Sequence, residues 1–530
     1  MDWGPRDFMA PGRSLAVGDR GMVATSHPAA TLAGIDVLRG GGNAIDAAIA
    51  AVALQGVVDP HMTGIGGDCF VLYAPASGGV PVAHNGSGRA PARVDPDRLR
   101  ARGLAAIPDD SAHAVTVPGA VDAWCRLAAD HGTMGIAELF APAIRAAEEG
   151  FLVTPRAARD WQRYGDRIAR HGAAVYLPGG SPPRAGDRLV HPALGATLRR
   201  IARDGRAGFY EGPVAEEIVS ILQGMGSPIE LDDFAASEPE YVAPISALYR
   251  DARLWECPPN GQGVAALLIA RILDGFDLAD PALSEADRIH LLAEATKAAY
   301  RRRDALVADP AFAPFDVDTL LSDDMVAALR APITLARALN ASRWDLPVHR
   351  DTVHVAVVDR DGNAVSFINS LFFAFGSGIY APRAGVLLQN RGAGFRLVEG
   401  HPNVLAPRKR PLHTIVPAIL EVGGRAVMPF GVMGGQYQAA GHVQILTGLL
   451  DRGLDIQQAC DAPRSFALEG TLSLETTIPA AVADDLANRG HQVAFADEPL
   501  GACNAIYIDY ARSVLFGASD HRKDGVAFGL

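Results

Sequence analysis

The sequence has little of what several classes of protein require, and basic charge is the first shortage. Acidic residues outnumber basic ones, and the formal net charge is −12. A protein that binds the phosphates of nucleic acid needs a basic surface, so we expect no nucleic-acid partner. No apolar stretch continues for the roughly 18 residues that a membrane-spanning helix needs, so we expect no membrane partner either.

Cysteine is also scarce. The five cysteines are scattered, with no CxxC pair and no histidine at a zinc-site spacing, so we expect no metal. Their odd number leaves at least one thiol outside any disulfide within the chain. Residues 1–6 show no basic segment that leads into an apolar one. Because a secretory signal of that kind is not visible, we expect a cytoplasmic location.

The composition suits a soluble enzyme with a large core, since 49% of the residues are hydrophobic and 20% are charged. The glycines at 64–67 predict a tight turn rather than a phosphate loop, because no Walker lysine follows them. Strands are expected at 22–25 and 70–73, and helices at about 29–39, 44–54, 264–273, 285–305, 436–450, 456–462 and 479–488. Each half of the chain has strands whose faces would be open without the other, so we expect one shared core.

Residues 352–368 form the most informative stretch. Val353–Val358 is apolar except for one histidine, Asp361-Gly362-Asn363 is a strong turn signal, and Ala364–Ile368 is strand-like again. The stretch therefore predicts a β-hairpin that begins with a threonine.

That threonine, Thr352, has a chemical use if the chain is cut before it. A threonine hydroxyl is a poor nucleophile without a neighbouring base, and the threonine's own α-amino group is one known base. The group is free only after a cut between Asp351 and Thr352. The loop-rich run 310–350 would allow the new ends to separate.

Short motifs follow one another in a fixed order along nearly the whole chain. They are Gly41-Gly42-Asn43-Ala44-Ile45-Asp46-Ala47-Ala48, Gly64-Ile65-Gly66-Gly67-Asp68, Val117-Pro118-Gly119, Pro258-Pro259, Ala293-Glu294-Ala295-Thr296-Lys297, Asp309-Pro310, Thr352-Val353-His354, Asp361-Gly362-Asn363-Ala364-Val365-Ser366, Phe375-Gly376-Ser377-Gly378 and Gly434-Gly435. Each is weak alone. Together, in this order, they resemble the γ-glutamyltransferase (γ-glutamyltranspeptidase) family of N-terminal-nucleophile (Ntn) hydrolases.

The resemblance implies an α/β (α+β) fold, a four-layer αββα sandwich with one shared core. It also implies a precursor that cuts itself into a large chain, 1–351, and a small chain, 352–530. The two chains would stay associated, with a dimer of such pairs as one possible assembly. No metal or organic cofactor is implied, and the substrate would be a small amide.

The resemblance also implies roles for particular residues. Thr352 would attack an amide carbonyl, and its freed α-amino group would accept the proton. Ser370 stands where the family has a threonine whose hydroxyl can bond that amino group. The backbone N–H groups of Gly434 and Gly435 would stabilise the oxyanion, although a Gly-Gly pair by itself indicates only a turn.

The residues expected to bind substrate depart from the family pattern. Ser87 takes the place of an arginine that clamps the donor's α-carboxylate, with Arg89 two residues away. Gly394 replaces the acidic residue that pairs with the α-ammonium. An arginine, Arg391, stands where the family usually has a neutral or acidic side chain. His413-Thr414 replaces a pair of serines that hold the carboxylate.

These departures indicate a different acyl group. A pocket that loses a carboxylate and gains an arginine suits an anionic acyl group without an amine. The variants resemble the branch of the family that includes oxamate amidohydrolase. We therefore expect Arg89, Arg391, His413 and Thr414 to bind an oxamate-like amide. Arg391 as an ion-paired arginine and His413 as a non-catalytic core histidine remain alternatives.

Two other functions remain open at this point. One is a γ-glutamyltranspeptidase or glutathione hydrolase that acts on γ-glutamyl amides, although nothing in the sequence indicates an acceptor site. The other is a non-catalytic or unprocessed member of the family.

Overall fold

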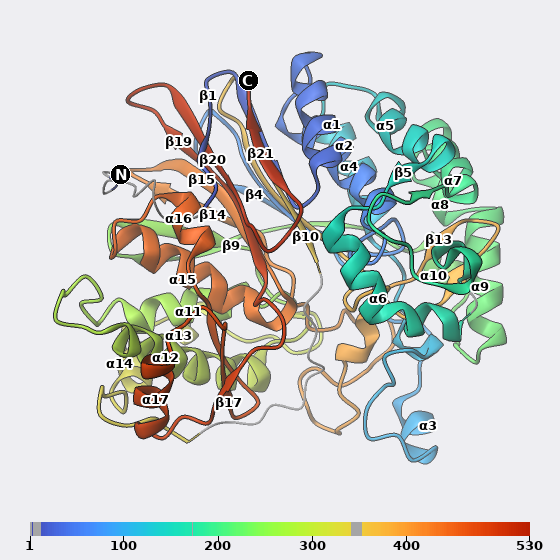
Figure 1. The fold of residues 1–530 in the computed structure, drawn as a ribbon. Coiled ribbons are helices and arrows are strands. Elements are labelled where there is room, and N and C mark those ends of the chain that lie inside the picture. Colours follow the sequence, from blue (N-terminus) through green and yellow to red (C-terminus); the bar gives the residue numbers. More distant parts are fainter. Residues whose placement is uncertain (1–2, 4–11, 172, 341–351) are drawn as a thin grey trace.

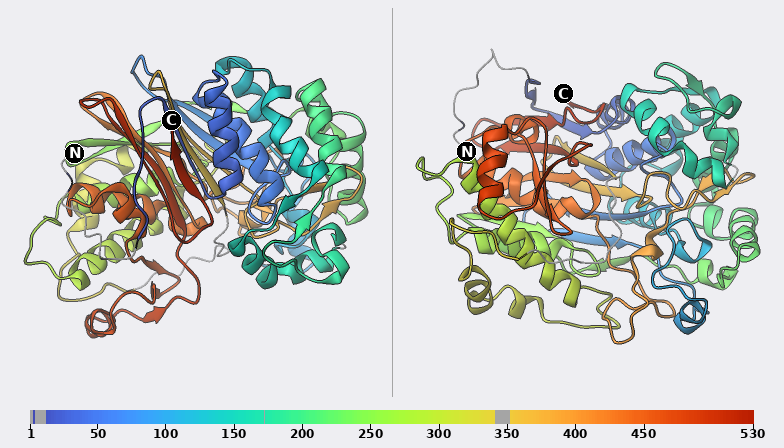
Figure 2. Two further views of the ribbon diagram at one scale, coloured as in Figure 1. Left: turned by 45° about the horizontal axis from the view of Figure 1, so that its top comes forward. Right: turned by 60° about the horizontal axis from the view of Figure 1, so that its bottom comes forward.

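Two sheets pack face to face, and helices cover the outer face of each, as Figure 1 shows. The computed structural model describes residues 3, 12–171, 173–340 and 352–530. The two other views in Figure 2 show the same layers, with the long sheet strands in the middle and helices on both sides. The architecture is the predicted αββα sandwich.

Each main sheet mixes strands from before and after residue 352. The first sheet has the order β21 (Val526–Gly529), β2 (Gly21–Thr25), β10 (Val353–Asp359), β11 (Ala364–Ser370), β3 (Asp68–Ala74), β4 (Val82–Gly86) and β7 (Glu240–Val242). The second has the order β1 (Ala16–Gly18), β20 (Val514–Ser519), β19 (Ala502–Asp509), β15 (Arg425–Met433), β14 (Ala418–Val422), β9 (Ala252–Glu256) and β8 (Ile245–Tyr249). The prediction of one shared core is therefore confirmed.

The helices fall into two groups. Those on the side of the first sheet pack on its strands or on one another. They are α1 (Pro28–Arg39), α2 (Ala44–Val58), α4 (Ala120–His131), α5 (Ile136–Glu149) and α7 (Pro192–Asp204). Those on the side of the second sheet are α11 (Gly263–Leu273), α12 (Glu285–Leu306), α14 (Asp323–Arg330), α15 (Gln438–Leu450) and α16 (Ile456–Asp461).

The remaining elements are shorter or lie outside these layers. The helices are α3 (Pro96–Ala101), α6 (Pro155–Arg170), α8 (Ala207–Tyr210), α9 (Pro213–Gly224), α10 (Leu231–Ala235), α13 (Val317–Leu320) and α17 (Ala480–Asn488). The strands are β5 (Phe151–Leu152), β6 (Arg188–Leu189), β12 (Tyr380–Ala381), β13 (Val386–Leu387), β16 (Ser465–Leu468), β17 (Thr471–Leu474) and β18 (Val493–Phe495).

The predicted hairpin at 352–368 is confirmed as β10 and β11, and both of its faces are buried. Val353, Val355 and Val357 belong to the core under α1 and α2, whereas Ala356 and Val358 belong to the core between the sheets. Side chains alternate along a strand, so Thr352 continues the row that faces the opposite sheet. This alternation decides where its hydroxyl points.

Some expected element boundaries were wrong, and α2 and β3 show the reason. Helix α2 continues to Val58 rather than ending at Leu54, because its whole surface is buried and apolar side chains continue into the last turn. Strand β3 begins at Asp68 rather than Phe70, because Asp68 pairs with Ser370 in the register of β11. Aspartate is a poor strand former, so tertiary pairing overrides the local preference here.

His354 lies in the core between the sheets. Its Nε2 is 2.9 Å from Ser366 Oγ, and burial, followed by the nearby His442, lowers its pKa to about 3. The imidazole is therefore neutral at physiological pH. It packs against the backbone of β15, because a Cβ at Gly431 would lie 2.3 Å from the His354 ring.

Gly431→Ala is therefore expected to destabilise the protein by about 1–3 kcal/mol, because the added methyl group overfills a closed core. Urea unfolding should show a lower midpoint with an unchanged slope. Gly224→Ala is the matched control, since a Cβ there meets nothing within 4 Å. Equal stability of the two variants would contradict this account of the sheet interface.

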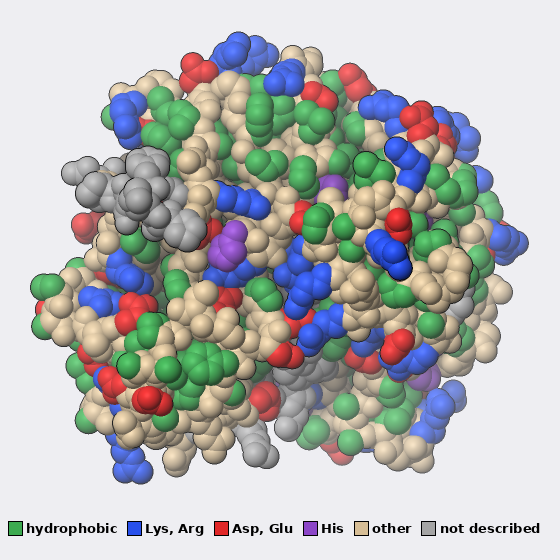
Figure 3. Space-filling model, in the orientation of Figure 1, with side chains coloured by type: hydrophobic (Ala, Val, Ile, Leu, Met, Phe, Trp, Pro, Cys, Tyr) green, Lys and Arg blue, Asp and Glu red, His purple; other side chains and the backbone are tan. Residues whose placement is uncertain are grey.

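The outer surface carries both signs of charge. On the face shown in Figure 3, acidic and basic side chains are interspersed, without a broad patch of one sign. No helix in the described part of the chain is long and apolar enough to cross a membrane.

Candidate active site

Three strands bring Thr352, Ser370 and Asp68 side by side at one end of the first sheet. Val353 pairs with Asn369, and Ser370 pairs with Asp68, so Thr352 lies beside Ser370. The Thr352 hydroxyl donates to Ser370 Oγ at 3.4 Å and accepts from Gln438 Nε2 at 3.3 Å. Thr352 is fully buried. The sheet register thus brings the two predicted hydroxyls together.

The Gly434–Gly435 pair forms the turn between β15 and α15. Both glycines have positive φ angles, +117° and +58°, where a side chain would be strained. A Cβ at Gly434 would also lie 2.8 Å from the Cα of Gly501. Gln438, which contacts Thr352, stands three residues after Gly435 at the start of α15. The turn is therefore on the same side of the sandwich as the threonine.

A buried glutamine, Gln262, connects this turn to the neighbouring loop. Its Nε2 donates to the Gly435 carbonyl at 3.0 Å and to the Thr414 carbonyl at 2.6 Å. Its Oε1 accepts from Arg303 Nη1 at 2.6 Å, and that same nitrogen donates to Gln436 Oε1 at 2.6 Å. These contacts tie the turn and the 413–414 loop to α12.

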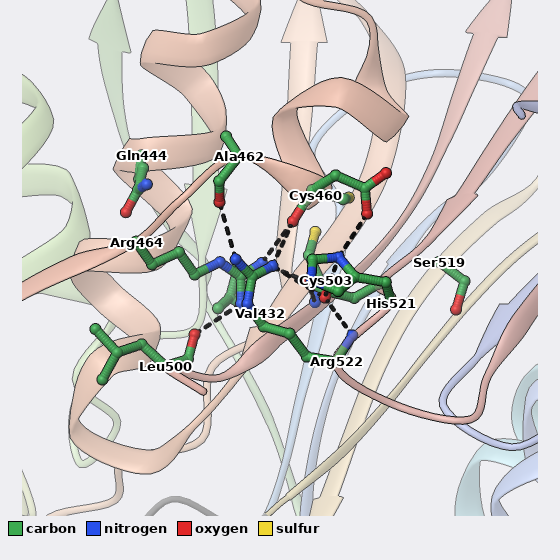
Figure 4. Close-up of polar contacts among 12 residues, drawn as sticks. Val432, Gln444, Cys460, Ala462, Arg464, Leu500, Cys503, Ser519, His521 and Arg522 are labelled. Atoms are coloured by element: carbon green, nitrogen blue, oxygen red, sulfur yellow. Dashed lines mark hydrogen bonds and ion pairs between the residues drawn. The ribbon is translucent and has the colours of Figure 1, made fainter. Parts of the chain in front are cut away.

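An ion cluster lies beside the loop that packs on this turn, and Figure 4 shows two of its members, Arg464 and Arg522, around Leu500. Arg464 pairs with Asp520 at 2.5 Å and donates to the Leu500 carbonyl at 2.7 Å. Arg522 donates to Glu475 Oε1 at 2.7 Å, and Glu475 Oε1 accepts the N–H of Leu500 at 2.9 Å. Leu500 precedes Gly501, which packs against Gly434. The cluster therefore has a structural role in holding the glycine turn.

Arg391 is a buried arginine with few partners. It is 1% exposed, its Nη1 donates to Thr414 Oγ1 at 2.9 Å, and its guanidinium lies 4.0 Å from the centre of the Phe372 ring. Its Nε and Nη2 have no hydrogen-bond partner among the described residues. Burial lowers the pKa of Arg391 to about 9, although the charge of Asp68 opposes this shift.

Phe372 connects this arginine to the hydroxyl pair. Its backbone N–H donates to Ser370 Oγ at 2.9 Å, two residues from the end of β11. Its φ angle is +83°, a conformation that is costly for a bulky residue and is found most often at functional sites. The strained turn brings the face of the ring under the Arg391 guanidinium, close to Ser370 and Thr352.

His413 and Asp68 make a second buried pair in this region. His413 Nε2 is 3.3 Å from Asp68 Oδ2, and the His413 ring packs edge-on against Phe70 with ring centres 4.8 Å apart. The neighbouring Thr414 contacts Arg391. Of the four predicted substrate-binding residues, the structure therefore brings Arg391, His413 and Thr414 together.

Arg89 lies in a different group of contacts. It pairs with Glu240 at 2.5 Å and with Asp309 at 3.5 Å, donates to the Arg408 carbonyl at 3.1 Å, and is 31% exposed. Ser87, in the position of the family arginine, donates to Asn85 at 2.7 Å. Gly394 has its carbonyl bonded to Asn403. Arg89 is thus already ion-paired, and Asp351, on the other side of the expected cut, is outside the described residues.

One group in the described part of the chain has metal-binding side chains, His290, Glu294 and His491. His290 Nδ1 is 2.8 Å from His491 Nε2, and Lys297 Nζ is 2.5 Å from Glu294 Oε1. A lysine thus already neutralises the carboxylate. Glu294 accepts the N–H of Leu339, and Lys297 donates to the Leu339 carbonyl. The group therefore holds the backbone at Leu339 in place.

Sequence reasoning missed three residues that contact the site. Gln438 and Gln262 are distant in sequence from their partners, and neither has a local pattern that indicates a role. Asp68 was only part of a family motif. Its signal was an acidic residue just before a buried apolar strand, where a carboxylate is costly unless it is paired or used.

Comparisons with known proteins agree on one family. Residues 30–530 match the family model described as Gamma-glutamyltranspeptidase. The chain is 38% identical over 529 residues to the glutathione hydrolase-like YwrD proenzyme of Bacillus subtilis, covering 97% of this chain and 99% of that protein. It is 36% identical over 541 residues to the oxamate amidohydrolase proenzyme of Klebsiella pneumoniae, with coverage of 97% and 99%. A crystal structure of cephalosporin acylase from Bacillus halodurans superposes with a TM-score of 0.93 at 37% identity, covering 99% of both chains.

Proposed function

Because the chain belongs to the gamma-glutamyltranspeptidase family of hydrolases, we propose that it cuts itself between Asp351 and Thr352 and uses Thr352 as an N-terminal nucleophile. The products are a large chain, 1–351, and a small chain, 352–530, which remain associated because each main sheet contains strands of both chains. The two relatives compared above are themselves named proenzymes.

The proposed reaction begins at the Thr352 hydroxyl. After cleavage its α-amino group, with an ordinary pKa near 7.7–8.0, accepts the hydroxyl proton as Oγ1 attacks the amide carbonyl. Ser370 Oγ orients the attacking group. The N–H groups of Gly434 and Gly435 stabilise the oxyanion, and the amine leaves with the proton that the α-amino group took up. Water then attacks the ester and gives a proton to the α-amino group, and the acyl group is released as Thr352 Oγ1 takes that proton back.

We further propose that the acyl group is anionic and lacks an amine, as in oxamate. The observation that carries this proposal is Arg391, a buried guanidinium with two nitrogens that lack partners among the described residues. Buried N–H groups without hydrogen-bond partners are costly, and a carboxylate satisfies a guanidinium with two parallel hydrogen bonds. Thr414 Oγ1, already bonded to Arg391, adds a third polar group. The glycine at 394 leaves no side-chain carboxylate there for an α-ammonium.

A γ-glutamyl amide is the second candidate substrate, favoured by the glutathione hydrolase-like relative. Purified protein supplied with oxamate and with γ-glutamyl-p-nitroanilide in parallel distinguishes the two. We expect ammonia release from oxamate and little p-nitroaniline. Release of p-nitroaniline with oxamate left intact would overturn the proposed substrate class while retaining the nucleophile.

A further inference from the structure

Asp68 is a buried carboxylate that accepts hydrogen bonds from two backbone N–H groups and contacts a histidine. It is 1% exposed, and its Oδ1 accepts the backbone N–H groups of Gly88 at 3.0 Å and Gly119 at 3.1 Å. Its Oδ2 lies 3.3 Å from His413 Nε2. The His413 Nδ1 accepts the N–H of Ile415 at 3.4 Å, which leaves Nε2 as the ring nitrogen that donates to Asp68. This carboxylate is built into the site but has no role in the proposed reaction.

Two cations act on this carboxylate. Arg391 and Arg410 are the cations that act on Asp68, while Cys69 beside it is a neutral thiol. Arg410 has its own counterion, because its Nη1 lies 2.7 Å from Glu240. Burial raises the pKa of Asp68 to about 6, with Arg391 as the largest opposing influence. Near neutral pH, Asp68 is therefore mostly a carboxylate, and its charge interacts with that of the Arg391 guanidinium.

A substrate carboxylate upsets this balance. When it binds Arg391, two anions share one cation in a buried space, and like charges so placed are strongly unfavourable. A proton taken up by the Asp68–His413 pair can neutralise the second anion. The proton is then either on the Asp68 carboxyl group or on the His413 ring. The proton then stays between two groups that are already in contact.

We propose that the Asp68–His413 pair takes up a proton when an anionic acyl group binds at Arg391, and that Asp68 thereby sets the charge preference of the pocket. This inference rests on the proposed function. Asp68 acts as a positioning residue, because its oxygens are bonded to the protein and it acts through Arg391 and His413.

The sign of the pH dependence follows from this coupling. Binding of the anion raises the pKa of the pair, so above about pH 6 each binding event takes up a proton. Affinity is then greatest at low pH and falls by up to about tenfold per pH unit as pH increases. Below the pKa of the empty pair, Asp68 is already protonated and affinity becomes constant. Between pH 6 and 7 both Arg391 and the Thr352 α-amino group remain mostly protonated, so they contribute little uptake.

Calorimetry with oxalate tests the proposal on the processed wild-type enzyme. Oxalate has the size and planarity of oxamate but offers no amide to hydrolyse. Titrations between pH 6 and 7, in buffers of different ionisation enthalpy, should show uptake of up to about one proton per oxalate bound. Oxalate binding without proton uptake would overturn the inference and leave the proposed function intact. Failure of oxalate to bind at any pH would overturn both.

Asp68→Asn separates the pair from the rest of the site. Asparagine keeps the Oδ1 that accepts the Gly88 and Gly119 N–H groups, so these two structural hydrogen bonds are retained. The variant should bind oxalate with little uptake and with an affinity that hardly changes between pH 6 and 7. Glu148→Gln is the control, because Glu148 pairs with Arg199, which is not among the cations that act on Asp68. It should retain the wild-type proton uptake, and equal loss in both variants would contradict a specific role for Asp68.

Discussion

Thr352→Ala is expected to leave the chain as one species of 55.7 kDa and to lower amide hydrolysis by at least about 10⁴-fold. The wild-type chain should instead run as two bands on a denaturing gel, at about two-thirds and one-third of that mass. The large effect has one cause: the hydroxyl that cuts the chain is also the nucleophile that attacks the substrate. Without it, neither the acyl-enzyme nor the free α-amino group can form.

Two comparisons make this result specific. Thr352→Ser keeps a hydroxyl at the start of β10 and should retain self-cleavage, with slower hydrolysis. Thr477→Ala alters an exposed threonine and should behave as the wild type. The proposal would be wrong if Thr352→Ala still gave two bands whose smaller fragment began at residue 352, or if the wild type stayed whole.

Arg391→Met should lower kcat/KM for oxamate by at least about 30-fold and up to roughly 1,000-fold, mainly through KM. Methionine fills much of the volume over Phe372 but removes the charge that would pair with the substrate carboxylate. Self-cleavage should be retained, because Arg391 contacts neither Thr352 nor the glycine turn in the described structure. Arg391→Lys should restore little activity, since an ammonium group cannot form the paired hydrogen bonds of a guanidinium.

Arg89→Met is the informative comparison for this prediction. Arg89 was an equal candidate from the sequence, but its guanidinium is paired with Glu240 and Asp309. Its loss should therefore change KM for oxamate far less than the loss of Arg391. A larger effect at Arg89 would mean that the ion cluster rearranges to bind the substrate and that Arg391 is a structural arginine.

The local pattern of the sequence was enough to predict the hairpin and most helices. The turn at Asp361-Gly362-Asn363 and the apolar runs on either side of it require no distant partner, and β10 and β11 lie where those signals indicate. The capping residue Asn43 likewise begins α2 as expected. The boundaries that failed were those set by packing, such as the start of β3 at Asp68.

The motifs also determined the family and the identity of the proposed nucleophile, Thr352, because order along the chain is a property of the sequence. Only the tertiary structure decided which side chains share the pocket. It paired Arg391 with Thr414 and Phe372, His413 with Asp68, and Arg89 with Glu240. The physical reason is that charge pairing depends on sheet register and loop packing between residues far apart in the chain. Those relations have no local signature that a sequence pattern could contain.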